Sequence, residues 1–315
     1  MKVDSSVIAP RETVLSIPAG VRWGLLGVLA FSFTLPLTRI AIDGLSPLFV
    51  GAGRAVVAAL LAGIALAVTR QRRPTTTQWG RLAIVAGGVV AGFPVLTSFA
   101  MTTTPASHGA VVIGVLPAAT AVAVVLRTRE RPTRSFWIFA SLGAVAAIVF
   151  AALQNDGLDS LSAADLLLFG AVIAAAIGYA EGGLLARELG SWQTVSWALI
   201  VAAPLMAALT VVSALQQPPA ATPVHWLAFA YLAAVSMFLG FFAWYRGLAI
   251  GPMAQVSQIQ LVQPVMGIAW AALLLHEQIG WATAIGGLAV IACAALAVRT
   301  RLITHRPSAP QGKDS

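Results

Sequence analysis

The sequence predicts an all-α membrane protein with ten transmembrane helices, arranged as two inverted five-helix repeats. The first observation behind this prediction is composition, because 59% of the 315 residues are hydrophobic and only 10% are charged, unlike a soluble domain. The second is a recurrence of apolar runs about 20 residues long, the length that crosses a bilayer. These runs are continuous rather than alternating, which disfavours a β-barrel. The third observation is an internal repeat.

The internal repeat relates residues 104–130 to residues 251–277. Each segment has a proline near its start, a second proline in its middle and a glutamate at its end. The spacing of the three landmarks is identical in the two segments, which carry Pro105, Pro117 and Glu130 in the first and Pro252, Pro264 and Glu277 in the second. Such self-similarity indicates two copies of one structural unit. We expect these copies at residues 22–152 and 153–298.

Ten apolar segments are long enough to be spans, and short loops join them. The first repeat is predicted to hold spans at 22–42, 47–68, 79–101, 106–126 and 135–152, and the second at 163–184, 191–213, 225–248, 253–275 and 280–298. Residues 1–21 and 299–315 lack such a run and contain prolines, so we expect two tails. No clear cleavage site follows the first apolar run, so no removed signal peptide is expected.

The basic residues determine the predicted orientation. With the amino terminus in the cytosol, all but two of the 19 Lys and Arg residues fall on the cytosolic side, the exceptions being Arg39 and Arg54. Cytoplasmic loops of membrane proteins carry this excess of positive charge. Both termini are then cytosolic. The net charge of +8 belongs to a membrane surface, so we expect lipids rather than nucleic acid as neighbours.

An odd number of spans per repeat means that the second copy lies upside down relative to the first. Inverted repeats are a recurrent design of secondary transporters, because the two copies can exchange conformations and open a shared site to alternate sides. The chain contains no GxxxxGK[ST] motif for ATP, so coupling would be to an ion or substrate gradient, without a cofactor. A single cysteine, Cys293, provides no cysteine motif for a metal.

Several short motifs accompany the repeat frame. Pro-Ala-Ser-His-Gly stands at 105–109 and Gln-Pro at 263–264, while Trp-Gly at 23–24, Arg54 and Ala-Trp-Tyr-Arg-Gly-Leu-Ala at 243–249 lie elsewhere in the spans. Together these residues resemble the EamA-type unit of the drug/metabolite transporter superfamily over about residues 22–298. The resemblance implies a ten-helix exporter of small metabolites, amino acids or drugs in the bacterial cytoplasmic (inner) membrane. The three threonines at 102–104 depart from the second copy.

Glu181 is the clearest charged residue inside a predicted span. A charge near the centre of a bilayer costs about 2.5–3.5 kcal/mol on insertion scales, so its presence needs a reason. Glu181 either titrates with protons, or binds an ammonium group of the substrate, or has a structural role. In the structural role it reaches water or pairs with an arginine, for which Arg246 is the candidate because it lies at a similar depth in span eight.

Arg54 lies about two turns into span two. It either binds a substrate carboxylate or forms a structural pair near the outer surface, where its long side chain can reach. The partners considered for that pair are Asp43 and Glu277, and the structural pair is the favoured interpretation. Arg39 is nearer the membrane edge and reads as an anchor.

Span nine contains an excess of glutamine. Gln255, Gln258 and Gln263 fall on one helical face, so we predict that they line a cavity; the alternative is hydrogen bonding between helices. The equivalent positions of span four are largely apolar, so the predicted site is chemically asymmetric. Pro117 and Pro264 each free a backbone carbonyl one turn earlier, which bends the helix or provides a ligand.

His108 and three aromatic residues complete the candidate set. His108, at the outer start of span four, is either a titrating gate or, more commonly for such a residue, an interfacial histidine. Tyr179, Trp244 and Tyr245 are candidates to stack on an apolar substrate, although ordinary packing is the favoured interpretation of each of them.

Three classes of function remain for this sequence. A small-molecule exporter is favoured, and an enzyme is not expected because the chain lacks HExxH, GxSxG and paired intramembrane carboxylates. A non-transporting scaffold or sensor is the third class. The substrate stays open: Glu181 and the aromatics fit an amine or amphipathic cation, as in multidrug efflux, whereas Arg54 and the glutamines fit an amino acid or another zwitterion. Protons are the candidate coupling ion, and a homodimer is one possible assembly.

Overall fold

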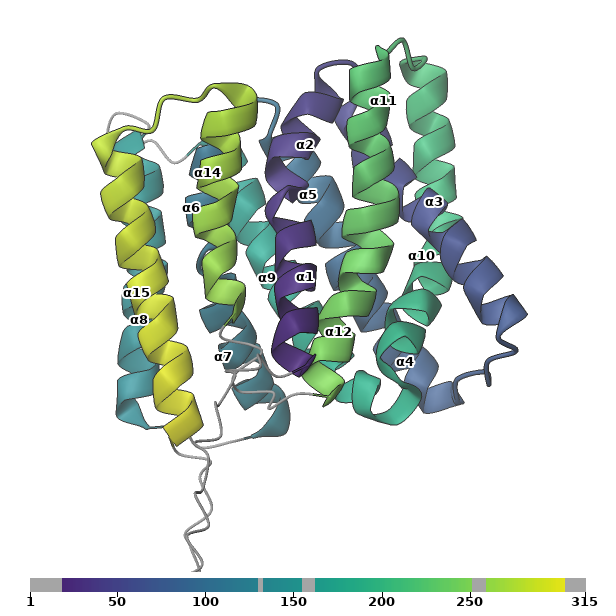
Figure 1. Ribbon diagram of the computed structural model, residues 1–315, viewed down its shortest axis with the longest axis horizontal. Helices are drawn as coiled ribbons and strands as arrows, with labels where there is room; N and C mark the ends of the chain where they lie inside the picture. Colours follow the sequence, from purple (N-terminus) through teal and green to yellow (C-terminus); the bar gives the residue numbers. More distant parts are fainter. Residues whose placement is uncertain (1–18, 130–132, 155–161, 251–258, 304–315) are drawn as a thin grey trace, which may run out of the picture.

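In the computed structural model, the protein is a bundle of long helices that run between a lower and an upper edge (Figure 1). The structure describes residues 19–129, 133–154, 162–250 and 259–303. Within these ranges it contains no strand, and nine helical segments are long and apolar enough to cross a membrane. A shorter apolar helix, Gln260–Leu275, is the described part of the predicted ninth span. The observed spans match the predicted ones to within a few residues at each end.

The first repeat contains five spans, and its first, third and fourth spans are interrupted. Its first two spans are α1 (Ala19–Ser32) with α2 (Thr34–Ile42), and α3 (Pro47–Val68). The third span consists of α4 (Thr76–Val85), the π-helical segment η1 (Ala86–Gly92) and α5 (Phe93–Ala100). The fourth is split into α6 (Ala106–Ile113) and α7 (Leu116–Thr128), and the fifth is α8 (Arg134–Gln154).

The second repeat follows the same plan with one difference in its first span. That span is the continuous helix α9 (Ala163–Leu189), and it is followed by α10 (Ser191–Gln216). The next span consists of α11 (Pro223–Ala230), the π-helical segment η2 (Tyr231–Leu239) and α12 (Gly240–Ile250). The last two are the 3₁₀ turn η3 (Gln260–Val262) with α14 (Gln263–Leu275), and α15 (Trp281–Ile303).

Local structure repeats in register between the two copies. The third span of each copy starts with a capping box, in which the N–H of Thr75 donates to Gln78 and the N–H of Thr222 donates to His225. The fourth span of the first copy ends on Arg129 and that of the second on His276, both in the left-handed region at φ 57° and 55°. The two residues of each pair are separated along the sequence by the same number of positions as Pro105 and Pro252. The repeat predicted from three landmarks therefore extends to helix starts and ends.

Helix packing obeys the two-fold relation of an inverted repeat. The second span of each copy packs against its counterpart, α3 on α10, and so does the fifth, α8 on α15. The first span packs across the repeats on the third, α1 on α12 in one half of the molecule and α9 on α5 in the other. The fourth spans run in opposite directions, because α7 leads toward the lower edge in Figure 1 and α14 toward the upper edge.

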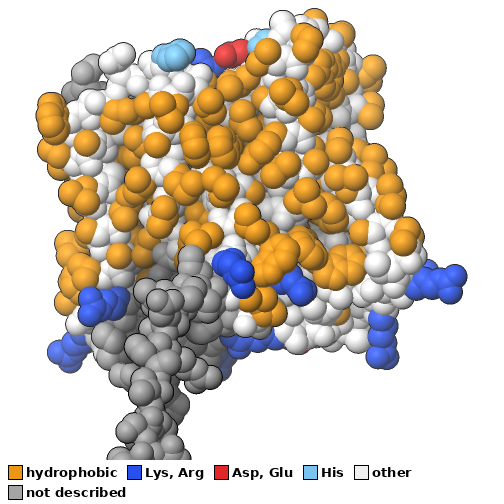
Figure 2. Space-filling view, in the orientation of Figure 1, with side chains coloured by type: hydrophobic (Ala, Val, Ile, Leu, Met, Phe, Trp, Pro, Cys, Tyr) orange, Lys and Arg blue, Asp and Glu red, His pale blue; other side chains and the backbone are white. Residues whose placement is uncertain are grey.

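The surface has the character of a membrane protein. Figure 2 shows hydrophobic side chains over the middle of the visible face, and exposed apolar residues include Leu60, Ile64 and Leu288. Lys and Arg side chains follow the lower edge, where the described chain both begins and ends (Figures 1 and 2). We call this the basic edge and the other one the opposite edge. By the positive-inside rule we expect the basic edge to face the cytosol.

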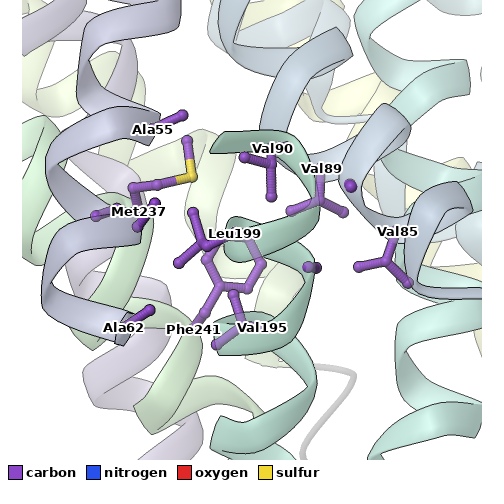
Figure 3. Packing of buried hydrophobic residues seen from close by; sticks show 14 of the residues in the cluster. Ala55, Ala62, Val85, Val89, Val90, Val195, Leu199, Met237 and Phe241 are labelled. Atoms are coloured by element: carbon purple, nitrogen blue, oxygen red, sulfur yellow. The ribbon is translucent and has the colours of Figure 1, made fainter. Parts of the chain in front are cut away.

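Close backbone contact joins the two repeats inside the bundle. A Cβ on Gly88 of η1 would lie 2.3 Å from the carbonyl oxygen of Ala174 in α9, and one on Gly178 would lie 3.1 Å from the backbone of Val89. Only glycine permits this approach, which explains Gly178 by packing. Beside this contact, Figure 3 shows Val89, Leu199 and Met237 filling one apolar cluster between spans of both repeats.

Candidate functional site

Helix interruptions from both repeats meet in the middle of the bundle. The first span breaks at Phe33, the fourth breaks between Ile113 and Leu116, and the ninth changes from a 3₁₀ turn to an α-helix at Gln263. Two small cavities of about 30 Å³ each lie at this level, and they share Phe31, Thr34, Phe93, Leu116 and Gln263 among their lining residues. We refer to them together as the central cavity. Each has room for about one or two water molecules.

The two prolines of the repeat frame stand where these interruptions occur. Pro117 is in the first turn of α7 and Pro264 is in the first turn of α14, and both line the central cavity. Proline is tolerated at the start of a helix, where its missing N–H would be unbonded anyway. Each proline therefore begins a new helical segment beside the cavity.

The walls of the central cavity are mainly apolar and aromatic. Phe31, Phe93, Tyr179 and Phe241 supply rings, and Met237 adds a flexible side chain. The polar lining includes the hydroxyl groups of Thr34 and Ser236, which hydrogen-bond to each other across the repeats at 2.8 Å. Gln263 also lines the cavity, and its buried Oε1 has no hydrogen-bond partner. Such a lining suits a small molecule with an apolar body and a few polar groups, and the cavities would have to widen from about 30 Å³ each to admit it.

Arg54 is the only charged residue among the described lining residues of the central cavity. Its side chain is 1% exposed, and its Nε and Nη2 atoms have no hydrogen-bond partner. The structural pair favoured from the sequence does not form. Asp43 pairs instead with Arg39 at 2.7 Å, and Glu277 binds backbone N–H groups of another helix.

Glu181 lies outside the central cavity, in a network of ion pairs near the basic edge. It is 2% exposed, and its carboxylate accepts hydrogen bonds from Arg81 of α4 and from Nε of Arg127 of α7, the latter at 2.7 Å. Arg81 also pairs with Glu188. We call these four residues the Glu181 network. Glu181 is thus a paired carboxylate, as one sequence interpretation held.

The partner proposed for Glu181 was wrong. Arg246 is exposed, and its guanidinium lies over the ring of Trp23 at 5.6 Å from the centroid. The correct partners come from spans three and four, and only the packing of α9 against α4 and α7 brings them together. The arginine-rich loops next to these spans were the available signal, but they could not single out Arg81 and Arg127.

The remaining aromatic candidates divide into lining and packing residues. Tyr179 lines the central cavity, whereas Trp244 and Tyr245 are not among its lining residues. Trp244 is 4% exposed and packs closely on Gly27 of α1, so that a Cβ there would lie 2.9 Å from the Trp244 backbone nitrogen. Tyr245 is 2% exposed and, like Trp244, belongs to the apolar cluster that contains Val89, Leu199 and Met237.

His108 forms a buried pair that sequence reasoning missed. Its Nε2 lies 2.7 Å from Oδ1 of Asp165, and both side chains are buried. Asp165 also closes the capping box of α9 with Ser162. The spacing Ser-x-x-Asp before an apolar run predicts that box, but not the histidine. His108 is not among the lining residues of the central cavity.

Glu277 connects the two repeats at the opposite edge. Its carboxylate accepts the backbone N–H groups of Ala106 at 2.7 Å and Ser107 at 2.9 Å, which are the first residues of α6. A carboxylate at a helix start satisfies unpaired N–H groups and suits the helix dipole. Gln255, Gln258 and Glu130 lie outside the described residues, so the predicted cavity-lining role of the two glutamines stays a prediction.

An inverted repeat that closes around a central cavity is the architecture of a secondary transport protein. The EamA-like transporter family matches the chain over residues 18–152 and 162–299. The chain therefore belongs to the EamA-like transporter family. It is 43% identical to the "Uncharacterized transporter YdeK" of Bacillus subtilis (strain 168) over 284 residues, which cover 88% of this chain and 96% of that protein.

A solved structure supports the fold. The structure titled "Crystal structure of protein" superposes with a TM-score of 0.61 at 18% sequence identity, covering 91% of this chain and 99% of that one. At this identity the likeness concerns the fold alone. Membership of the drug/metabolite transporter superfamily, which the motifs implied, agrees with the family match.

Proposed function

We propose that this transporter is a secondary exporter that moves a small metabolite across the bacterial cytoplasmic membrane by alternating access. The observation that carries the proposal is the central cavity, which lies where helix interruptions of both repeats meet. The helices can bend at these interruptions because the ladder of backbone hydrogen bonds is already broken there. Family membership supports transport, whereas the export direction and the substrate class are proposed here without that support.

The proposed alternation uses two charged contacts between the repeats. At the opposite edge, Glu277 of the second repeat binds the start of α6 in the first. Toward the basic edge, Glu181 of the second repeat binds Arg81 and Arg127 of the first. Each contact borders a wider hollow, of about 400 Å³ beside Glu277 and about 600 Å³ beside Glu181. Opening the cavity to one edge would break the contact there and keep the other.

Proton coupling is the energy source that we propose to test first. A proton would have to compete with two guanidinium groups for Glu181. The buried pair of His108 and Asp165 is a second candidate, since its imidazole and carboxylate lie 2.7 Å apart and could exchange a proton. Stimulation of flux by a pH gradient that disappears in Glu181→Gln would assign coupling to the Glu181 network. Stimulation that survives in Glu181→Gln and disappears in His108→Gln would assign it to the pair.

Efflux of organic cations is the alternative of the same class. A carboxylate or aromatic rings can stabilise an organic cation inside a membrane protein, but the central cavity also contains the guanidinium group of Arg54, which would repel such a cation. The described lining of the central cavity contains no carboxylate, and Glu181 already binds two arginines. This arrangement favours a metabolite with an acid group over a cationic drug.

Flux through purified protein in liposomes tests the proposal. The liposomes are loaded with radiolabelled amino acids, organic acids, sugars and lipophilic cations, and release is compared with protein-free liposomes. Gly267 lines the cavity and a Cβ there would lie 3.2 Å from Ala110, so Gly267→Leu should reduce release at least tenfold. Gly183, whose Cβ would meet nothing within 4 Å, provides the control Gly183→Leu, which should leave release unchanged. Release of no solute above background would favour a scaffold or sensor.

A further inference from the structure

We propose that Arg54 is the anion-binding residue of the central cavity, and that the substrate is a small carboxylic acid with an apolar body and a neighbouring N–H donor. This inference rests on the proposed function and names the substrate class of the same site. Its first support is the contrast between Arg54 and the other buried charged side chains.

Buried charges elsewhere in the described spans have partners of opposite charge. Glu181 binds two arginines, and Asp165 binds His108. Arg54 is buried as deeply, but its Nε and Nη2 donate to nothing, and no carboxylate is among the described residues that line its cavity. A buried charge without a counter-ion is strongly unfavourable. An anionic ligand in the cavity would remove that cost.

The packing of the helix that carries Arg54 suits a binding residue. Arg54 follows two glycines on α3 that allow close packing: a Cβ on Gly51 would lie 2.8 Å from Cα of Val95, and one on Gly53 would lie 3.2 Å from the ring of Phe229. The turn of α3 that leads into Arg54 is therefore packed closely against α5 and α11. Precise binding requires side chains held on rigid elements, and a guanidinium can bind a carboxylate through two parallel hydrogen bonds.

The other lining groups describe the rest of the molecule. The buried Oε1 of Gln263 has no partner and can accept a hydrogen bond from an ammonium or amide group. Phe31, Tyr179 and Phe241 supply an apolar surface around the same space. An acid that carries an N–H donor beside its carboxylate, as an α-amino acid does, fits both polar groups. A single guanidinium suits one negative charge.

Two matched series of probes test this substrate class. The first contains L-phenylalanine, 3-phenylpropionate, phenylalaninamide and phenethylamine, and the second contains L-leucine, 4-methylpentanoate, leucinamide and isopentylamine. Binding to purified full-length protein is measured by thermal shift, since a ligand of the folded state raises the unfolding temperature. We expect the amino acids to shift it most, the acids to shift it less, and the amides and amines to leave it unchanged.

Two variants connect the result to Arg54. Arg54→Gln should weaken binding of the acids and amino acids at least tenfold, since losing a hydrogen bond to a charged group lowers affinity by about that factor or more. Arg39→Gln removes a similar charge at the surface, where Arg39 pairs with Asp43, and should change nothing. Shifts with the amines, no shift with any acid, or acid binding that survives in Arg54→Gln would overturn the inference.

The same probes separate this inference from the proposed function. Flux of an amine but of no acid would keep the transporter and reject the acid site. Acid binding that depends on Arg54 without flux of any probe would keep the site and count against transport. Because Arg54→Gln removes an uncompensated charge, we expect it to fold as well as the wild type, so that loss of binding cannot be attributed to unfolding.

Discussion

The region around Glu181 and the region around Arg54 present the same problem with opposite solutions. Both side chains are almost completely buried, at 2% and 1% exposure. Glu181 is surrounded by two guanidinium groups, whereas two nitrogens of Arg54 have no partner. A membrane charge with its counter-ions in place needs no further explanation, while one without them calls for a ligand.

This difference corrects the interpretation that the sequence favours for Arg54. From the sequence, functional and structural roles both stay open for Glu181, whereas Arg54 reads as a structural pair. The structure places the pair at Glu181 and the unsatisfied charge at Arg54. Sequence neighbours tell how costly a membrane charge is, but its partners come from other helices.

The largest effect is expected from removing both partners of Glu181. In the double variant Arg81→Met with Arg127→Met, a buried carboxylate loses its counter-ions, so the free energy of unfolding should fall by about 3–5 kcal/mol. Unfolding in detergent, followed by circular dichroism, measures this change. Adding Glu181→Gln should restore most of the stability. A double variant as stable as the wild type would show that these ion pairs do not hold Glu181.

Replacing Arg54 should have the opposite sign. Arg54→Met removes a buried charge that has no counter-ion in the cavity, so stability should stay the same or rise by about 1–4 kcal/mol. The same unfolding experiment measures it, with Arg39→Met as the control at the surface. A loss of about 3 kcal/mol instead would mean that Arg54 serves as a structural residue, and the comparison with Glu181 would break down.

A smaller effect is expected at the opposite edge. Glu277→Gln weakens the cap on α6 and should cost about 1 kcal/mol, while favouring a state that is open at that edge. Ser107 is 5% exposed, so Ser107→Cys in a Cys293→Ala background reports opening through its reaction with a membrane-impermeant maleimide. Labelling should rise in Glu277→Gln and not in the basic-edge control Glu188→Gln. Equal labelling in both would argue against the contact as a closure.

The smallest effect is expected at Arg246. Its guanidinium lies over Trp23 at an exposed position, where such a contact contributes about 0.5–1 kcal/mol. Arg246→Gln should therefore lower stability by no more than this and leave probe binding unchanged. Unfolding and thermal-shift measurements together check it, and a loss of acid binding would place Arg246 in the binding site.

Local sequence by itself determined the ten spans, their order and the duplicated frame. Apolar run length, caps such as Thr75 with Gln78, and the prolines at 117 and 264 act over one or two turns, so the printed sequence contains the whole cause. The EamA-type motifs could be read in the same way.

Tertiary structure alone decided which charges are satisfied. Arg81 and Arg127 reach Glu181 from helices far away in the chain, Asp165 meets His108 across spans, and Glu277 caps a helix of the other repeat. The partner of a buried charge depends on how helices pack and on which of their faces meet. That information is distributed over the contacts of the whole bundle, which is why the site, unlike the spans, emerged only from the fold.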